Sequence, residues 1–140
     1  MGIRYQGNSV VKTPKKLKVW KRKLKAMDYC LEELENHGFR YRKTRNAVTD
    51  GIWINEKERV VIKQPYHERS SVPAVAAPTI IVPTEDEGYP IVIQVLCETP
   101  FTYKEAVDLV DKLERRIRLD TDIHTGNVGR YRNQPVLFDW

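Results

Sequence analysis

Six large apolar residues near the start of the chain recur in alternating steps of three and four. They are Leu17, Trp20, Leu24, Met27, Leu31 and Leu34. This spacing places all six on one face of an α-helix. Thr13-Pro14 favours a helix start, because a hydroxyl can cap the first turn and proline fits the first helical position. Gly38 favours an end, since glycine adopts the left-handed C-cap conformation. The pattern therefore predicts one long amphipathic helix over residues 14–36.

Beyond Gly38, short runs rich in β-branched and aromatic residues lie between turn-like segments, as is typical of β-strands, and the first run alternates apolar and polar residues. The segments that fit this pattern are residues 39–42, 47–54, 59–64, 79–82 and 90–96. The polar residues 55–58 favour a hairpin turn, so the first three strands are expected to form an antiparallel meander. Residues 65–79 contain three prolines and are expected to be a loop.

A second helix is predicted over residues 103–118. It begins with Thr102-Tyr-Lys-Glu105, in which threonine and glutamate can cap backbone groups of the first turn. Its apolar face consists of Ala106, Leu109, Val110, Leu113 and Ile117. A loop rich in Asp, Gly and Asn follows, and then a short apolar strand before Asp139. The fold class predicted is α+β: a small antiparallel five-stranded sheet with a long N-terminal amphipathic helix, then a helix and a hairpin-like loop.

Composition narrows the class of protein. A chain of 140 residues, 41% of them hydrophobic, fits one domain or two small packed lobes with a modest core. No apolar run approaches the roughly 20 residues that span a bilayer, and the N-terminus lacks a signal-peptide apolar region. Cys30 and Cys97 lie far apart, without metal-type spacing, which favours two buried, reduced thiols. We therefore expect a cytoplasmic protein with no membrane partner.

The formal net charge of +5 is unevenly distributed, because residues 12–25 are almost purely basic. The macrodipole disfavours lysines at a helix N-terminus by about 0.3–1 kcal/mol each, so another cause must favour them. Lys15, Lys18, Lys21, Arg22 and Lys25 are candidates for binding an acidic protein or, less favoured, nucleic acid. The alternative is a solvated basic face without a partner.

A loop motif and the order of elements give a more specific hypothesis. The motif is Asp122-Ile-His124-Thr-Gly126-Asn127 with Asp139 twelve residues later, and a Val61-Ile62-Lys63 strand precedes it. Together they resemble the protein-kinase-like superfamily over roughly residues 39–140. The Asp-x-His-x-Gly-Asn form is closer to the aminoglycoside phosphotransferase and atypical-kinase branches than to Ser/Thr kinases. It is also similar to small kinase-like proteins of some bacteriophages.

The resemblance implies ATP and Mg²⁺ as cofactors and a role for each matching residue. Asp122 would be the catalytic base, and Lys63 would pair with the α- and β-phosphates. Gln94 to Glu98 would form the hinge that meets the adenine. Asn127 and Asp139 would hold Mg²⁺, as oxygen ligands suit this cation. His124 would support the loop.

The chain also departs from the family pattern. No glycine-rich phosphate loop lies between Gly38 and Gly51, and the segment after Lys63 is too short for the helix whose glutamate pairs with that lysine. No C-terminal lobe follows Asp139, so a dimer, a minimal lobe and a degenerate remnant all remain open. We expect an N-terminal arm over residues 1–12 and one reduced kinase-like domain over residues 13–140. The domain would comprise a basic helix (13–38), a sheet similar to a kinase N-lobe (39–98), and a helix with the catalytic-loop-like segment (99–140).

Two functions follow. One is a kinase-like protein that binds Mg-ATP, either a minimal phosphotransferase or a pseudokinase. The alternative is a non-catalytic phage-type protein that binds a host protein, or nucleic acid, in the host cytoplasm through its basic helix 13–36.

Overall fold

The computed structural model describes residues 13–43, 49–65, 72, 75–83, 89–116 and 123–138. The chain divides into two compact units. The sheet unit comprises Thr13–Val72 and Pro78–Leu96. The hairpin unit comprises Met1–Lys12, Pro73–Ala77 and Cys97–Trp140. The expected N-terminal arm, the acidic turn around residues 85–87 and residues 117–122 lie outside the described residues.

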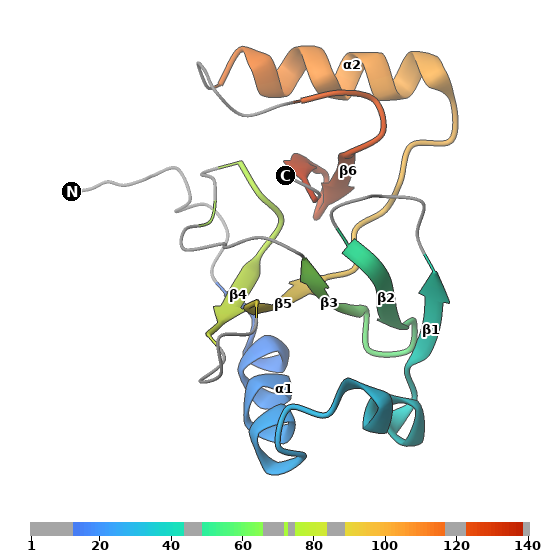
Figure 1. Ribbon diagram of the computed structural model, residues 1–140. Helices are drawn as coiled ribbons and strands as arrows, with labels where there is room; N and C mark the ends of the chain where they lie inside the picture. The colour runs from blue at the N-terminus through green and yellow to red at the C-terminus, as the bar shows by residue number, and fades with distance from the viewer. Residues whose placement is uncertain are drawn as a thin grey trace, which may run out of the picture. The chain divides into compact units, whose positions relative to one another are not determined.

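The sheet unit contains a five-stranded antiparallel sheet, which confirms this part of the predicted α+β fold. Its strands are β1 (Arg40–Lys43), β2 (Thr49–Asn55), β3 (Val60–Pro65), β4 (Thr79–Val82) and β5 (Ile91–Val95). Their order across the sheet is β1-β2-β3-β5-β4 (Figure 1). The first three strands form the expected meander, and β5 inserts between β3 and β4, so that β3 and β5 are central.

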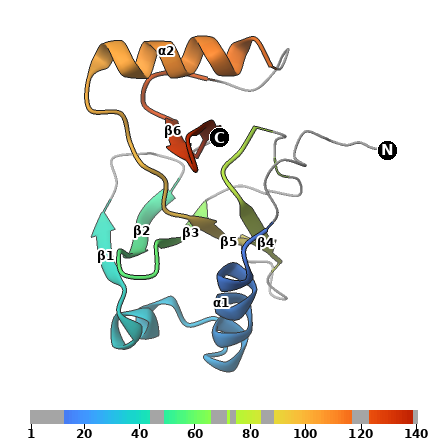
Figure 2. The same cartoon turned by 180° about the vertical axis from the view of Figure 1, so that it is seen from behind.

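Helix α1 (Lys15–Ala26) packs against β4 and β5, as Figure 2 shows from behind. Its apolar stripe of Leu17, Trp20 and Leu24 is buried, as the three-four spacing predicts. The Trp20 ring meets Phe39 edge-on, with ring centroids 4.7 Å apart. Its indole Nε1–H donates to Glu58 Oε1 at 3.1 Å. The buried indole thus has a partner for its one polar group, and α1 is fixed to the rest of the sheet unit.

The prediction of a continuous helix over residues 14–36 is wrong. The α-helix ends at Ala26, because Asp28 and Tyr29 take left-handed φ angles of 55° and 59°. The Tyr29 N–H donates to the Leu24 carbonyl at 2.8 Å and closes the last turn. The chain then continues as the 3₁₀ helix η2 (Leu31–His37), which ends at Gly38 with φ 90°. The acidic residues Glu32 and Glu33 therefore occupy the first turn of η2, where a helix dipole favours them.

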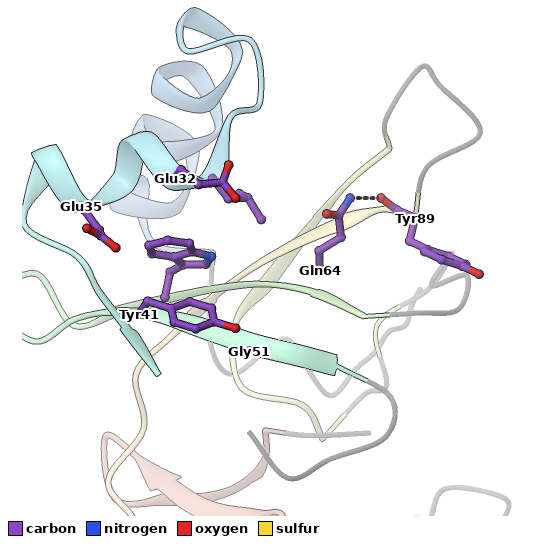
Figure 3. Close-up of a pocket in the computed structure, with 8 residues that line it drawn as sticks. Glu32, Glu35, Tyr41, Gly51, Gln64 and Tyr89 are labelled. Carbon is purple, nitrogen blue, oxygen red and sulfur yellow. Dashed lines mark hydrogen bonds between the residues drawn. The ribbon is translucent and has the colours of Figure 1, made fainter. Parts of the chain in front are cut away.

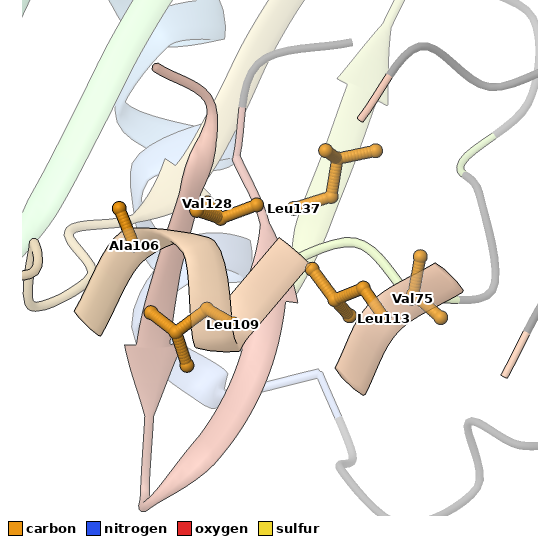
Figure 4. Packing of buried hydrophobic residues seen from close by; sticks show 6 residues of the cluster. All are labelled: Val75, Ala106, Leu109, Leu113, Val128 and Leu137. Atoms are coloured by element: carbon orange, nitrogen blue, oxygen red, sulfur yellow. The ribbon is translucent and has the colours of Figure 1, made fainter. Parts of the chain in front are cut away.

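The hairpin unit consists of one helix and a two-stranded sheet among its described residues. Helix α2 (Tyr103–Glu114) covers a hairpin of β6 (Val128–Tyr131) and β7 (Gln134–Leu137). Its core is drawn in Figure 4 and comprises Val75, Ala106, Leu109, Leu113, Val128 and Leu137. The backbone of Leu137 also bonds to Val75 and Ala77, so residues 75–77 extend this small sheet. None of the helices described in either unit is long and apolar enough to cross a membrane.

The start of α2 follows the predicted capping box. Thr102 Oγ1 accepts the Glu105 N–H at 3.1 Å, and Glu105 Oε1 accepts the Phe101 N–H at 2.8 Å. The other carboxylate oxygen of Glu105 pairs with Arg130 of β6 in a partly buried ion pair. One side chain therefore both caps α2 and links it to the hairpin.

Candidate functional site

Lys63 and Gln94 lie on the same face of the large sheet. Ile62 pairs with Trp53 and Ile93, and the side chains of these three residues share one face of the sheet. Phe39 and the buried stripe of α1 pack on this face. Side chains alternate along a strand, so Lys63 points to the opposite face. Gln94 shares that face, because it pairs with Val61, two residues before Lys63. The sheet thus brings together the candidate phosphate-binding lysine and the first residue of the predicted hinge.

Gln94 is nearly fully buried, with 2% of its surface exposed. Its Nε2 donates to Thr79 Oγ1 of the neighbouring strand at 2.9 Å. A buried carboxamide needs such partners, because an unsatisfied polar group would cost about 1–3 kcal/mol. Gln94 therefore has a structural role across β4 and β5, and its predicted contact with a nucleotide stays a prediction.

Glu98 lies in the hairpin unit, where its backbone forms a two-way bridge with Arg130. The Glu98 N–H donates to the Arg130 carbonyl at 2.9 Å, and the Arg130 N–H donates back at 2.8 Å. Gly129 permits this approach, because a Cβ there would lie only 2.6 Å from the Glu98 carbonyl oxygen. An adenine could not use these two backbone groups without breaking the bridge. The exposed side chain of Glu98 is the part that remains accessible.

Asn127 occupies a tight turn and is 2% exposed. Its Oδ1 accepts the His124 N–H at 2.9 Å, and its own N–H donates to the His124 carbonyl at 3.1 Å. The His124 Nδ1 accepts the Gly126 N–H at 3.0 Å, so the histidine supports the loop as expected. Asn127 therefore has a structural role in this turn, and its predicted contact with Mg²⁺ stays a prediction.

The two aspartates of the motif, Asp122 and Asp139, lie outside the described residues. Within the ranges that are described, no group of three or more His, Cys, Asp or Glu side chains could hold a metal ion. Of the predicted metal ligands, the described part of the chain therefore contributes Asn127 alone. The β6–β7 hairpin begins directly after Asn127 and ends before Asp139, and the binding of one cation by these two residues stays a prediction.

The predicted partner-binding cations of α1 share one exposed stripe. They are Lys15, Lys18, Lys21, Arg22 and Lys25. At 3.6 residues per turn these positions span an arc of about 120°, beside the buried stripe. None of the five forms an ion pair with a described residue. Their charges are therefore not neutralised by the part of the fold that the structure describes.

Sequence reasoning missed a cavity in the sheet unit. It has a volume of about 430 Å³ and lies between η2 and the first strands of the sheet (Figure 3). Its lining residues are Leu31, Glu32, Glu35, Tyr41, Gly51, Trp53, Gln64 and Tyr89. The one sequence signal for it is the three-residue step between Glu32 and Glu35. This step places both side chains on one side of the segment if the segment forms a 3₁₀ helix.

Comparison of the chain with protein-family models, with curated proteins and with solved structures found no match.

Proposed function

We propose that this protein binds Mg-ATP through a reduced kinase-like arrangement, as a minimal phosphotransferase or a pseudokinase. The observation that carries the proposal is the placement of Lys63. It lies on a central strand, on the face of the sheet away from the α1 core, and its side chain is half-buried. On the same face Ile54, Val61 and Val92 are buried apolar residues. A half-buried lysine on a central strand is the position from which the resembled family holds the α- and β-phosphates of its nucleotide.

The order of elements in the hairpin unit is a second support. Helix α2 is followed by the turn that contains Asn127, and then by the β6–β7 hairpin before residue 139. This order matches the helix, loop and metal-aspartate order of the resembled family. In that arrangement Asn127 and Asp139 would supply oxygen ligands to Mg²⁺, and the cation would neutralise phosphate charge. Asp122 would accept a proton from an attacking hydroxyl if the protein is catalytic.

The first experiment is thermal unfolding with and without Mg-ATP. A ligand that binds only the folded state stabilises it by mass action, by about 1.4 kcal/mol at tenfold excess over Kd. For a chain of this size that corresponds to a rise in Tm of roughly 5 °C. Lys63→Met and Asp139→Ala should each remove most of this rise. No rise at millimolar Mg-ATP would refute the proposed site.

The control addresses the basic stripe of α1, which can bind polyphosphates without any nucleotide site. Lys18→Met removes the same charge as Lys63→Met, but from the exposed helix. We expect it to leave the Mg-ATP effect unchanged. Equal losses from the two variants, or an equal Tm rise with Mg-triphosphate, would mean that the ligand is held by non-specific charge attraction.

The basic stripe favours a second candidate function, the binding of an acidic protein partner. Five cations on one exposed arc, without ion pairs to described residues, form a surface complementary to a run of carboxylates. This function does not require nucleotide binding, and the two can coexist in one protein.

A fluorescent polyglutamate peptide tests this second candidate, with single-stranded DNA of equal charge as the competitor ligand. Stronger binding of the peptide, lost between about 50 and 300 mM salt, would support an acidic protein partner. The double variant Lys18→Glu/Arg22→Glu should abolish it, whereas reversal of Arg40, which pairs with Glu56 on the sheet, should not. Preference for DNA would exclude the acidic-protein function in favour of nucleic acid.

A further inference from the structure

The cavity beneath η2 is lined by two carboxylates that lie on the same side of one helix. Residues three apart eclipse each other in a 3₁₀ helix, so Glu32 and Glu35 project in the same direction. Both residues line the cavity, and Figure 3 draws them along η2, on the side of Tyr41 and Gly51 that the helix covers. Neither carboxylate forms an ion pair with a described residue, and the contact of Glu32 is a 3.6 Å hydrogen bond from the Cys30 thiol.

Aromatic rings form the floor of the same cavity. Tyr41 and Trp53 face each other across β1 and β2, with ring centroids 4.8 Å apart and an interplanar angle of 56°. The Tyr41 phenol extends over Gly51 and leaves no room for a Cβ at that position. Trp53 is 7% exposed and Tyr41 is 42% exposed, so one ring is a fixed base and the other an accessible wall.

The carboxamide of Gln64, which also lines the cavity, offers an acceptor as well. Gln64 uses its Nε2 to donate to the Tyr89 carbonyl at 2.7 Å, as the dashed line in Figure 3 marks. The carboxamide oxygen is left to accept a hydrogen bond. Among the residues that the structure describes, no lysine or arginine lines the cavity, although the chain as a whole has a net charge of +5.

Carboxylates, an amide oxygen and aromatic faces all attract the same kind of ligand. A cation over a tyrosine or tryptophan ring is stabilised by the ring quadrupole, and its N–H groups donate to carboxylates. The geometry points to a binding site for an organic cation that carries N–H donors, a guanidinium or an alkylammonium group. The volume of about 430 Å³ fits a small molecule or a single extended side chain. The lining residue Trp53 pairs with Ile62, on the sheet face opposite to Lys63 and Gln94, so this site lies on another face than the proposed Mg-ATP site.

The test is an NMR titration of the full chain that follows the Trp53 indole N–H and the Gly51 amide. The probes are agmatine, for a free small cation, and N-acetyl-arginine amide, for an arginine side chain of a protein. N-acetyl-citrulline amide is the neutral control of the same shape. We expect saturable shifts in the millimolar range or below for at least one cation, and none for the citrulline probe. Binding of the arginine amide assigns the ligand to a protein side chain, and binding of agmatine alone assigns it to a free cation.

The variants separate a built site from general charge attraction. Glu35→Gln keeps the shape of the side chain and should weaken binding about tenfold, since a charge-assisted hydrogen bond is lost. Glu33→Gln is the matched control, because Glu33 lies on the same helix, accepts a hydrogen bond from Asn36 at 3.1 Å and does not line the cavity. The inference is overturned if neither cation binds, if citrulline binds equally, or if the two variants weaken binding to the same extent.

Discussion

Trp20 should be the side chain whose loss most weakens the attachment of α1 to the sheet. It is 1% exposed, and a buried tryptophan removes on the order of 200 Å² from water. At about 25 cal/mol per Å² this gives about 5 kcal/mol as an upper bound, since the unfolded chain already buries part of that area. Trp20→Ala should therefore cost about 3–5 kcal/mol of unfolding free energy, as large-to-small core changes do.

Trp20→Phe separates the hydrogen bond from the packing. The variant keeps an aromatic ring beside Phe39 but loses the donor to Glu58 and some volume, so we expect a loss of about 1–2 kcal/mol. Urea unfolding followed by far-UV circular dichroism measures both changes. If Trp20→Ala does not fold, the phenylalanine variant still gives a midpoint.

Lys18→Ala is the control for the Trp20 variants, because it changes an exposed position of the same helix and should shift stability by less than about 0.5 kcal/mol. A loss below about 1 kcal/mol for Trp20→Ala, with an unchanged m-value, would refute the packing of α1 on β4 and β5. A loss as large for Lys18→Ala, where alanine is the better helix former, would show that the effect of Trp20→Ala is not specific to the Trp20 contact.

Two further changes test the hairpin unit. Thr102→Ala removes the N-cap of α2 and should cost about 1 kcal/mol in urea unfolding, whereas Thr102→Ser should restore most of it; equal losses would contradict the capping role. Gly129→Ala places a Cβ 2.6 Å from the Glu98 carbonyl oxygen, a backbone atom that cannot rotate away, so it should cost more than about 2 kcal/mol. Hydrogen exchange of the Glu98 and Arg130 amides should speed up in that variant, and unchanged protection would contradict the bridge.

The strands could be predicted because their signals are local. Short runs rich in Val, Ile and aromatic residues identified all five strands of the large sheet, and prolines marked the connection after β3. The start of α2 was predictable for the same reason, since Thr102 and Glu105 bond within one turn. Alternation also determines that Lys63 and Ile62 point to opposite faces.

The break between α1 and η2 could not be predicted from the apolar spacing, which continues through it. Leu34 is buried, just as a continuous helix would require, but it is buried after a left-handed turn at Asp28 and Tyr29. Aspartate tolerates that conformation, whereas tyrosine gives no such signal. Two interactions stabilise the turn: the Leu24 carbonyl accepts the Tyr29 N–H, and Leu34 packs in the core. The apolar spacing alone is the same for this broken helix and for a straight one.

Strand β6 was missed because its residues serve long-range contacts. Gly129 interrupts the apolar pattern, and it is needed for the close approach of Glu98. The hairpin turn uses Arg132 and Asn133, both with positive φ, where asparagine alone is a typical turn residue. The bonds from residues 75–77 to Leu137 join segments about sixty residues apart, which no local pattern reports. The same reason hid the cavity, since Glu35 and Tyr41 meet only in the folded chain.

The structural role of Asn127 decides how the Mg-ATP hypothesis must be tested. Its side chain holds a buried turn, so the fold requires it whether or not a metal binds, and Asn127→Ala should lower Tm without any ligand. A simple loss of stability or activity in that variant would therefore not distinguish the two roles. A variant of Lys63 separates the two roles better. Lys63 pairs with Ile52 and Val92 through backbone groups, and Lys63→Met retains these groups. The quantity that separates ligand binding from folding is the increment in Tm caused by Mg-ATP in each variant, compared with the variant's own ligand-free value. If Lys63→Met keeps the full increment, the kinase-like assignment of this lysine is wrong, however stable the variant is.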